Sequence, residues 1–279
     1  MLAKDIIIID KLPERIEERI VTKAINYALI SIPFTYNRME LSKLANRIQN
    51  ITKGKIAELI FQHFMIKNKL EVNFSSCQTP FYMPDKRDFL MGEYEWDIKN
   101  NFVRSASILK SDQVIELPAL VPNRPSSQYF TDQWEKRNEM KHPTSLGTRF
   151  VFTYMERPVK RDFIDVQIHS QLQKFYEMIK QKYPKVKKGQ APFTDTWFWN
   201  EMSKVDFPRY QLNQKLRLYI TSWAGEEHFK YFYDTEKQNF NNMIYTILKN
   251  KTIKTHRIPS FASLFPKLQD DMICGRFIS

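Results

Sequence analysis

The sequence predicts an α/β fold in which a mixed central β-sheet is flanked by helices, with N-terminal helices and a C-terminal elaboration. Residues 14–31 and 54–69 repeat apolar side chains at the spacing of an amphipathic helix. Residues 88–99 place alternating apolar and charged side chains around a glycine, a pattern typical of a β-hairpin. Residues 149–155 are rich in aromatic and β-branched side chains and predict a buried strand.

The composition limits the classes of protein. Hydrophobic residues make up 42% of the 279 residues and aromatic residues 14%, enough for a substantial core. Lys and Arg outnumber Asp and Glu by 43 to 31, and the resulting net charge of +12 favours nucleic acid as partner. No apolar run approaches the roughly 20 residues that span a bilayer, and the start shows no signal-peptide pattern. Because only Cys77 and Cys274 occur, far apart, we expect a reduced, cytoplasmic protein without a membrane partner.

Because no clear linker interrupts the sequence, one compact unit is favoured, in which residues 1–52 are expected to form an N-terminal helical region. A short apolar strand is predicted at 6–9, followed by a helix over 14–31. Pro33 is the expected end of this helix, because proline lacks the amide hydrogen that continues it. A second helix is predicted over 38–50.

The next helix, over 54–69, carries the first candidate site residue. Thr52 is a suitable N-cap, and the helix is apolar on most sides. Glu58 is its one acidic residue, and Gln62 lies one turn further along the same edge. A strand is expected over 70–74. A lone Glu on such a helix is usually a half-exposed residue at the edge of the buried face. A functional role for Glu58 is therefore supported only by the acidic residues further along the chain.

The hairpin over 88–99 is the centre of the predicted site. Glycine at the first position of a two-residue loop favours a tight turn, so Gly92-Glu93 is the expected tip, which places Asp88 opposite Asp97. Since strand side chains alternate, one face is apolar and the other is charged. The apolar face holds Phe89, Met91, Tyr94, Trp96 and Ile98, and the charged face holds Asp88, Glu95, Asp97 and Lys99.

The two opposed acids predict a cation site. Opposed Cβ atoms on one face lie about 4.5–5.5 Å apart, where like charges repel unless something neutralises them. Carboxylate oxygens are the ligands that Mg²⁺ prefers, and Lys99 lies on the same face as Asp88 and Asp97. The alternative is the ordinary polar face of a half-buried hairpin, because Asp-x-Lys is a common tripeptide.

Four predicted elements follow one another along the chain: a helix with Glu, a strand, a strand with Asp and a strand with Asp-x-Lys. This order resembles the PD-(D/E)xK nuclease superfamily, which includes restriction endonucleases, junction resolvases and repair nucleases. The resemblance covers roughly residues 53–155 and implies a restriction-endonuclease-like fold with a catalytic core at 53–160.

The resemblance also implies site residues. By position, the catalytic residues are Glu58, Asp88, Asp97 and Lys99, with the three acids as ligands of one or two Mg²⁺ ions, for which Mn²⁺ can substitute. Asp85, which follows Pro84 as in the literal motif, is the alternative to Asp88. Glu95 and Gln62 are candidate supplementary ligands.

The implied activity is Mg²⁺-dependent hydrolysis of phosphodiester bonds in double-stranded DNA, as in a type II restriction endonuclease. A homodimer is expected, because paired cuts in a duplex need two active sites. The alternatives are a structure-selective repair or recombination nuclease, an RNA-cleaving nuclease of the same fold, and a non-catalytic DNA-binding protein. A structural or membrane-surface protein in which the motif is incidental is a further alternative.

Residues 161–279 are expected to form a helical, basic elaboration with late strands that complete or flank the sheet. The further elements expected along the chain are strands at 114–121, 216–223 and from 251, and helices at 162–182, within 189–213, from 225 and at 239–248. The candidate DNA contacts are polar or basic residues in strands and loops: Asn100, Asn101, Arg124, Lys136, Arg137, Lys185, Lys187, Lys188, Lys254 and Arg257.

Overall fold

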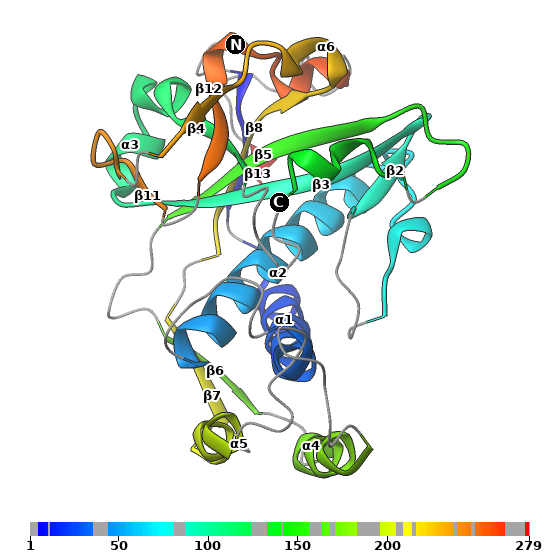
Figure 1. Cartoon of the computed structure of the whole chain (residues 1–279). Coiled ribbons are helices and arrows are strands. Elements are labelled where there is room, and N and C mark those ends of the chain that lie inside the picture. Colours follow the sequence, from blue (N-terminus) through cyan, green and yellow to red (C-terminus); the bar gives the residue numbers. More distant parts are fainter. Residues whose placement is uncertain are drawn as a thin grey trace.

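A central β-sheet separates two layers of the molecule (Figure 1). On one side lie the long helices α1 (Glu14–Thr35) and α2 (Leu44–Lys67), and on the other lies a smaller sheet. The structure is a computed structural model, and it describes residues 5–10, 12–35, 44–80, 87–123, 133–140, 142–156, 163–167, 171–182, 196–204, 209–213, 216–236, 239–246, 249–265 and 277–278. The predicted mixed α/β architecture is confirmed.

The central sheet is mixed and has the strand order β10-β11-β3-β5-β8-β1-β13, with β2 also paired to β3. β3 runs parallel to β5 and β1 runs parallel to β13, whereas the other neighbours are antiparallel. Its strands are β1 (Ile7–Asp10), β2 (Phe89–Met91), β3 (Tyr94–Val103), β5 (Thr148–Glu156), β8 (Leu218–Ala224), β10 (Asn239–Phe240), β11 (Ile244–Tyr245) and β13 (Phe277–Ile278). β1 pairs with β8 in this sheet, so the N-terminal region contributes to the same core.

The first helix does not end where the sequence predicts. Pro33 lies inside α1, which continues to Thr35. Proline has no amide hydrogen, so the carbonyl of Leu29 one turn earlier loses its helical donor. The hydroxyl of Tyr176, on α4 (Gln171–Lys182), donates to this carbonyl instead. A helix distant in sequence therefore compensates for the proline.

α2 is one helix where the sequence predicts two. Thr52, the expected N-cap, is fully buried inside it, and Gly54 lies within the same helix. Glycine costs about 1 kcal/mol in a helix interior relative to alanine. The buried side chains of Ile56, Ile60 and Phe61 on the sheet-facing side outweigh that cost, because burying one large apolar side chain contributes about 1.5–3 kcal/mol.

The opposite face of the central sheet is covered by a three-stranded sheet. Its strands are β4 (Pro118–Pro122), β12 (Asn250–Lys254) and β9 (Tyr233–Thr235), in the order β4-β12-β9. Phe150, Phe152 and Tyr154 of β5 point into the core between the two sheets. The late strand expected from residue 251 is therefore present, and it flanks the central sheet.

Several predicted elements differ from those observed. The strand expected at 70–74 is a single bridge between Asn73 and Leu90. The helix expected at 239–248 is the β10–β11 hairpin, whose turn holds Asn241 and Asn242 at φ of 48° and 59°. Asparagine tolerates this left-handed region better than most residues, which favours a turn over a helix.

The remaining elements are short. They are β6 (Phe163–Gln167) and β7 (Arg209–Asn213), which form a two-stranded sheet, α3 (Ala106–Leu109), α5 (Thr196–Ser203), α6 (Glu226–Phe229) and the 3₁₀ turns Ser75–Cys77, Asp112–Glu116, Glu135–Asn138, Thr255–Arg257 and Phe261–Leu264. The helix expected at 162–182 thus begins only at Gln171, and the strand expected at 114–121 begins only at Pro118. No helix among the described residues is long and apolar enough to cross a membrane.

Candidate functional site

The predicted hairpin is formed by β2 and β3 in the predicted register. Gly92 has a φ of 59° at the turn, and Phe89 pairs with Trp96 across the ladder. Phe89 and Trp96 are fully buried, with ring centroids 5.9 Å apart, and the ring of Phe61 on α2 stacks 5.2 Å from that of Phe89. The apolar face is therefore anchored on α2, which leaves Glu95, Asp97 and Lys99 on the other face of β3.

Asp97 and Lys99 form a buried ion pair. Each residue is 7% exposed, and the ammonium of Lys99 donates to the carboxylate of Asp97. The Lys99 Nζ also lies 5.3 Å from the ring centroid of Phe150 on the neighbouring strand. Buried charges are costly unless they are paired, so this position of a lysine and an acid needs a structural or chemical reason.

Asp88 lies immediately before β2. β2 begins at Phe89, so the Asp88–Asp97 pair lies one position beyond the ladder, and the carboxylate of Asp88 accepts a hydrogen bond of 2.6 Å from the amide of Ile98. Burial raises the pKa of Asp88 well above its ordinary value, and the carboxylates of Glu58 and Asp97 raise this pKa further. The three acids named from the sequence thus interact electrostatically around one carboxylate.

Glu58 reaches this group from α2, together with a residue that the sequence reasoning missed. Lys55, one turn before Glu58 on the helix, donates to its carboxylate and lies 4.6 Å from the ring centroid of Tyr27 on α1. Burial lowers the pKa of Lys55, but Glu58 and Asp88 outweigh that effect and raise it. The i, i+3 spacing of Lys55 and Glu58 is a signal that could have identified the pair. Gln62 is half-buried one turn after Glu58.

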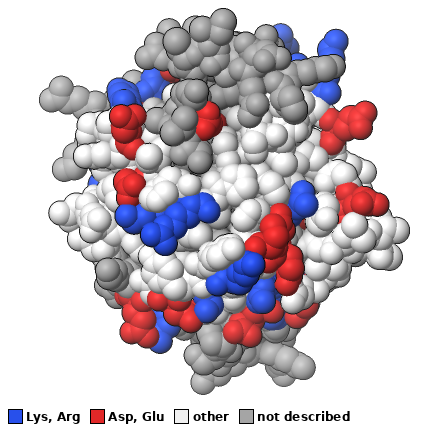
Figure 2. All heavy atoms as spheres, turned by 90° about the horizontal axis from the view of Figure 1, so that it is seen from above, with Lys and Arg blue, Asp and Glu red and all other residues white. Residues whose placement is uncertain are grey.

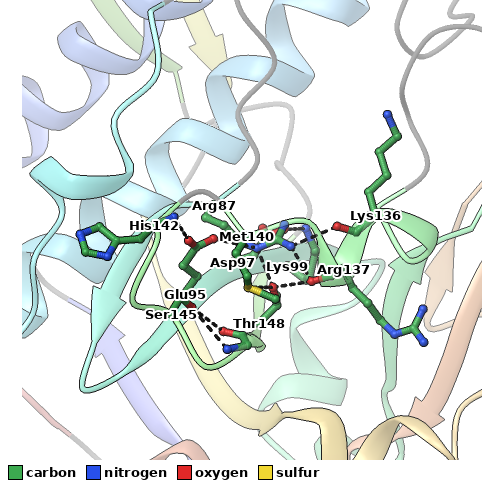
Figure 3. A network of polar contacts seen from close by, with 11 residues as sticks. Arg87, Glu95, Asp97, Lys99, Lys136, Arg137, Met140, His142, Ser145 and Thr148 are labelled. Carbon is green, nitrogen blue, oxygen red and sulfur yellow. Dashed lines mark hydrogen bonds and ion pairs between the residues drawn. The ribbon is translucent and has the colours of Figure 1, made fainter.

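Glu95, expected as a supplementary ligand, has partners within the chain (Figure 3). It is fully buried, accepts a hydrogen bond from the amide of His142, and has a carboxylate oxygen 3.6 Å from Nε of Arg87. Arg87 immediately precedes Asp88 and was not expected in the site. No sequence pattern marks it, because its contacts join residues up to 61 positions apart. Asp85 lies outside the described residues.

Three carboxylates suit a hard divalent cation by their chemistry, although the present conformation does not bring them together as ligands. Carboxylate oxygens, as on Glu58, Asp88 and Asp97, are the ligand type of Mg²⁺ and Mn²⁺, and burial followed by the charges of Glu58 and Asp97 raises the pKa of Asp88. In the present conformation Lys55, the Ile98 amide and Lys99 each contact one of these acids. Among the described residues, no group of three Asp, Glu, His or Cys side chains is arranged to hold a metal ion.

The predicted DNA contacts on β3 lie on its two faces. The amide oxygen of Asn100 accepts a hydrogen bond of 3.1 Å from the hydroxyl of Thr153 on β5. By strand alternation Asn100 shares the helix-side face with Ile98, whereas Asn101 continues the face of Asp97 and Lys99. Asn101 is therefore the better placed of the two to extend the site.

Among the described basic residues proposed as DNA contacts, Arg137 and Lys254 contact other parts of the protein. The Arg137 guanidinium lies 4.7 Å from the ring centroid of Trp134, and Figure 3 shows the side chains of Lys136 and Arg137 pointing away from the polar network. Lys254 Nζ lies 2.6 Å from Glu116, whereas Arg257 is exposed. Arg124, Lys185, Lys187 and Lys188 lie outside the described residues. On the face shown in Figure 2, acidic and basic side chains are intermixed and form no continuous basic surface among the described residues.

Comparisons with known proteins give no neighbour for this chain. No protein-family model matches it, and neither a curated protein nor a solved structure matches it. Function must therefore be argued from the residues themselves.

Proposed function

We propose that this chain is a metal-dependent endonuclease that hydrolyses phosphodiester bonds in double-stranded DNA, of the type II restriction kind. The observation that carries the proposal is the buried Asp97–Lys99 pair beside the Asp88 carboxylate, which accepts the Ile98 amide, and the raised pKa of Asp88 supports it. A strongly perturbed carboxyl group beside specific charged partners is typical of functional sites. A Mg²⁺ or Mn²⁺ ion at these carboxylates supplies Lewis-acid polarisation of the phosphate and a more acidic bound water.

The residues of the chain have separate tasks in this proposal. Asp88 and Asp97 would hold the cation, with Glu58 as a further ligand. The ammonium of Lys99 lies beside Asp97 and stabilises the negative charge that develops on the phosphate oxygens. The hydrogen bond from the Ile98 amide fixes the carboxylate of Asp88.

The order of elements supports the proposal. A helix with Glu58 precedes a strand that begins beside Asp88, and a tight turn leads to the strand with Asp97 and Lys99. This is the order of the PD-(D/E)xK resemblance, although the strand expected before Asp88 is reduced to the Asn73 bridge. The net charge of +12 supports a polyanionic substrate, and paired cuts in a duplex favour a homodimer.

The second candidate is a non-catalytic DNA-binding protein on the same fold. One observation favours it: Glu58, Asp88 and Asp97 each already have a contact within the chain, from Lys55, the Ile98 amide and Lys99. In that case the acids only stabilise the hairpin. The influence of Glu58 and Asp97 on Asp88, together with the buried Asp97–Lys99 pair, favours the nuclease, because hairpin stability alone does not call for a third acid beside two others.

A cleavage assay tests the proposal. The purified chain is incubated with unmethylated phage-sized duplex DNA in Mg²⁺ or in EDTA, and the products are resolved on a gel. Discrete fragments in Mg²⁺ alone support a sequence-specific endonuclease, and a smear indicates a nonspecific or structure-selective nuclease. No cleavage of duplex DNA, single strands or RNA, with DNA still bound, contradicts the proposal in favour of the binding protein.

A further inference from the structure

Arg87 connects the candidate site to three other parts of the chain. The residue is 4% exposed. Its Nε lies 2.9 Å from the hydroxyl of Thr148 and 3.6 Å from the carboxylate of Glu95. Its Nη2 lies 2.8 Å from the carbonyl of Arg137 and 3.3 Å from that of Lys136. Figure 3 shows these groups converging on the guanidinium.

The partners of Arg87 are themselves linked to one another. Glu95 on β3 and Thr148 on β5 are neighbours in the parallel ladder. The hydroxyl of Thr148 donates to the carbonyl of Arg137 at 2.5 Å, and the second oxygen of Glu95 accepts the amide of His142. The guanidinium therefore ties the beginnings of β3 and β5 to the segment that precedes β5. An arginine suits this task because its planar fork offers five donors.

This cluster adjoins Asp88 in the chain. On one side of Asp88, Arg87 is fixed by its four contacts, and on the other, Phe89 is fully buried against Trp96. Between them, the Asp88 amide donates to the carbonyl of Trp96 at 2.8 Å, and its carboxylate accepts the amide of Ile98 at 2.6 Å. Asp88 is thus held from both flanks at the start of β2.

We propose that Arg87 is a positioning residue: its buried contacts with Glu95, Thr148 and the 136–137 carbonyls hold the Asp88 carboxylate on the Ile98 amide, beside Glu58 and Asp97. Arg87 does not touch the reacting atoms and acts through Asp88. This inference rests on the proposed function, but hydrogen exchange at Ile98 tests it without any cleavage.

The test replaces Arg87 and follows the Ile98 amide by NMR-detected hydrogen exchange. In Arg87→Met, we expect hydrogen exchange at Ile98 to become about 10-fold faster or more. The hydrogen bond from the Ile98 amide to Asp88 can then break without also breaking the contacts of Arg87. The amides of the β3–β5 ladder keep their protection. With Mg²⁺ and duplex DNA, kcat falls about 10- to 100-fold with KM little changed, as for other residues that orient metal ligands.

Two further variants keep the test valid if Arg87→Met fails to fold through the unpaired charge of Glu95. Arg87→Met/Glu95→Gln removes both charges, and the same fast exchange at Ile98 is expected. Arg87→Lys retains the charge but not the planar guanidinium. It is therefore expected to restore part of the Ile98 protection against exchange and part of the wild-type kcat. Arg217→Met is the matched control, because Arg217 pairs with Glu156 at 3.0 Å at the other end of β5. It leaves Ile98 exchange and kcat unchanged.

The inference is overturned if Ile98 keeps its native protection in a folded Arg87→Met or in the double variant. It is also overturned if Arg217→Met accelerates Ile98 exchange equally, since Arg87 is then only a contributor to general stability. A wild-type chain that cuts no nucleic acid contradicts the proposed function instead, and exchange at Ile98 still decides the role of Arg87.

Discussion

Two regions of this molecule place carboxylates near lysines, and the pKa of an acid moves in opposite directions in them. On the three-stranded sheet and beside it, Lys251 lies 2.6 Å from Asp234 and Lys254 lies 2.6 Å from Glu116, both with exposed carboxylates. Hydrogen bonds from these lysines lower the pKa of each acid. At the start of β2, by contrast, the pKa of Asp88 is raised.

The difference arises from burial and from the balance of charge. In the exposed region each acid has its own lysine and remains in contact with solvent. Beside β2, the buried carboxylates of Asp88 and Asp97 and the half-buried carboxylate of Glu58 interact with two lysines, Lys55 and Lys99. Negative charge is left over where water cannot screen it well. Proteins retain such unfavourable arrangements mainly at functional sites, which is why the buried cluster and not the exposed pairs is the candidate centre.

The largest expected effect comes from breaking the buried pair. Lys99→Met is expected to lower kcat for duplex cleavage about 100-fold or more, because a charge that stabilises the transition state is lost. Binding to the same duplex, measured by fluorescence anisotropy in Ca²⁺, should change little. Asp97→Ala is expected to behave in the same way.

Two controls accompany this prediction. Lys254→Met removes an exposed lysine and should leave kcat within about twofold, since exposed pairs contribute little. Asp97→Asn/Lys99→Met removes both buried charges and separates lost folding from lost catalysis. Cleavage at the wild-type rate by a folded Lys99→Met would count against the catalytic assignment.

A smaller effect, on stability, is expected at Asp88. Its ordinary pKa is 3.8, and the folded chain raises it. The proton on Asp88 therefore stabilises the folded state fully below pH 3.8, and this contribution is lost as the pH rises through the raised pKa. Asp88→Asn removes the unfavourable charge but keeps an acceptor for the Ile98 amide. At pH 8 we expect a gain on the order of 1 kcal/mol in the free energy of unfolding, with no cleavage activity.

Urea denaturation of wild type and Asp88→Asn at several pH values measures this gain. It should shrink as the pH falls and vanish below about pH 4, where both side chains are neutral. A variant that is less stable than wild type at pH 8 would show that the ionised carboxylate is favourable, in contradiction to the raised pKa.

The smallest change in the free energy of unfolding is expected for Glu116→Gln, and its sign is opposite to that for Asp88→Asn. The hydrogen bond from Lys254 lowers the pKa of Glu116, so its stabilising contribution is present above the ordinary value of 4.5 and lost as the pH falls. Glu116→Gln should therefore lower stability at pH 8, but by less than about 0.5 kcal/mol because the pair is exposed. The same denaturation series in 1 M NaCl should abolish the difference. If Glu116→Gln were more stable than wild type at pH 8, Glu116 and Asp88 would no longer differ in the sign of their contribution to stability.

The hairpin could be predicted from the sequence because its determinants are local. Gly92 fixes the turn, and the two-residue period assigns Phe89 and Trp96 to the core and Asp97 and Lys99 to the other face. The PD-(D/E)xK resemblance led us to expect Glu58 near Asp88, and Glu58 raises the pKa of Asp88 in the structure, while the role of both residues stays a prediction. Local pattern was sufficient for the hairpin.

The features that escaped prediction depend on contacts between distant residues. Arg87 acts through groups 49 to 61 positions away, which no spacing rule reveals. Pro33 is tolerated inside α1 because Tyr176 supplies a donor from another helix. The β10–β11 hairpin replaces a predicted helix because β11 finds a partner in Val103 at the end of β3. In each case tertiary context overrode local propensity.

The most direct measurement of the central claim is the thermal stability of the chain with and without Mn²⁺, for wild type, Asp97→Asn and Glu116→Gln. A ligand that binds the folded state at 100 times its Kd stabilises it by about 2.7 kcal/mol. If the buried carboxylates form the metal centre, Mn²⁺ raises the Tm of wild type and Glu116→Gln equally and leaves that of Asp97→Asn unchanged. An equal rise in all three proteins, or no rise in wild type, contradicts a metal centre at the start of β2.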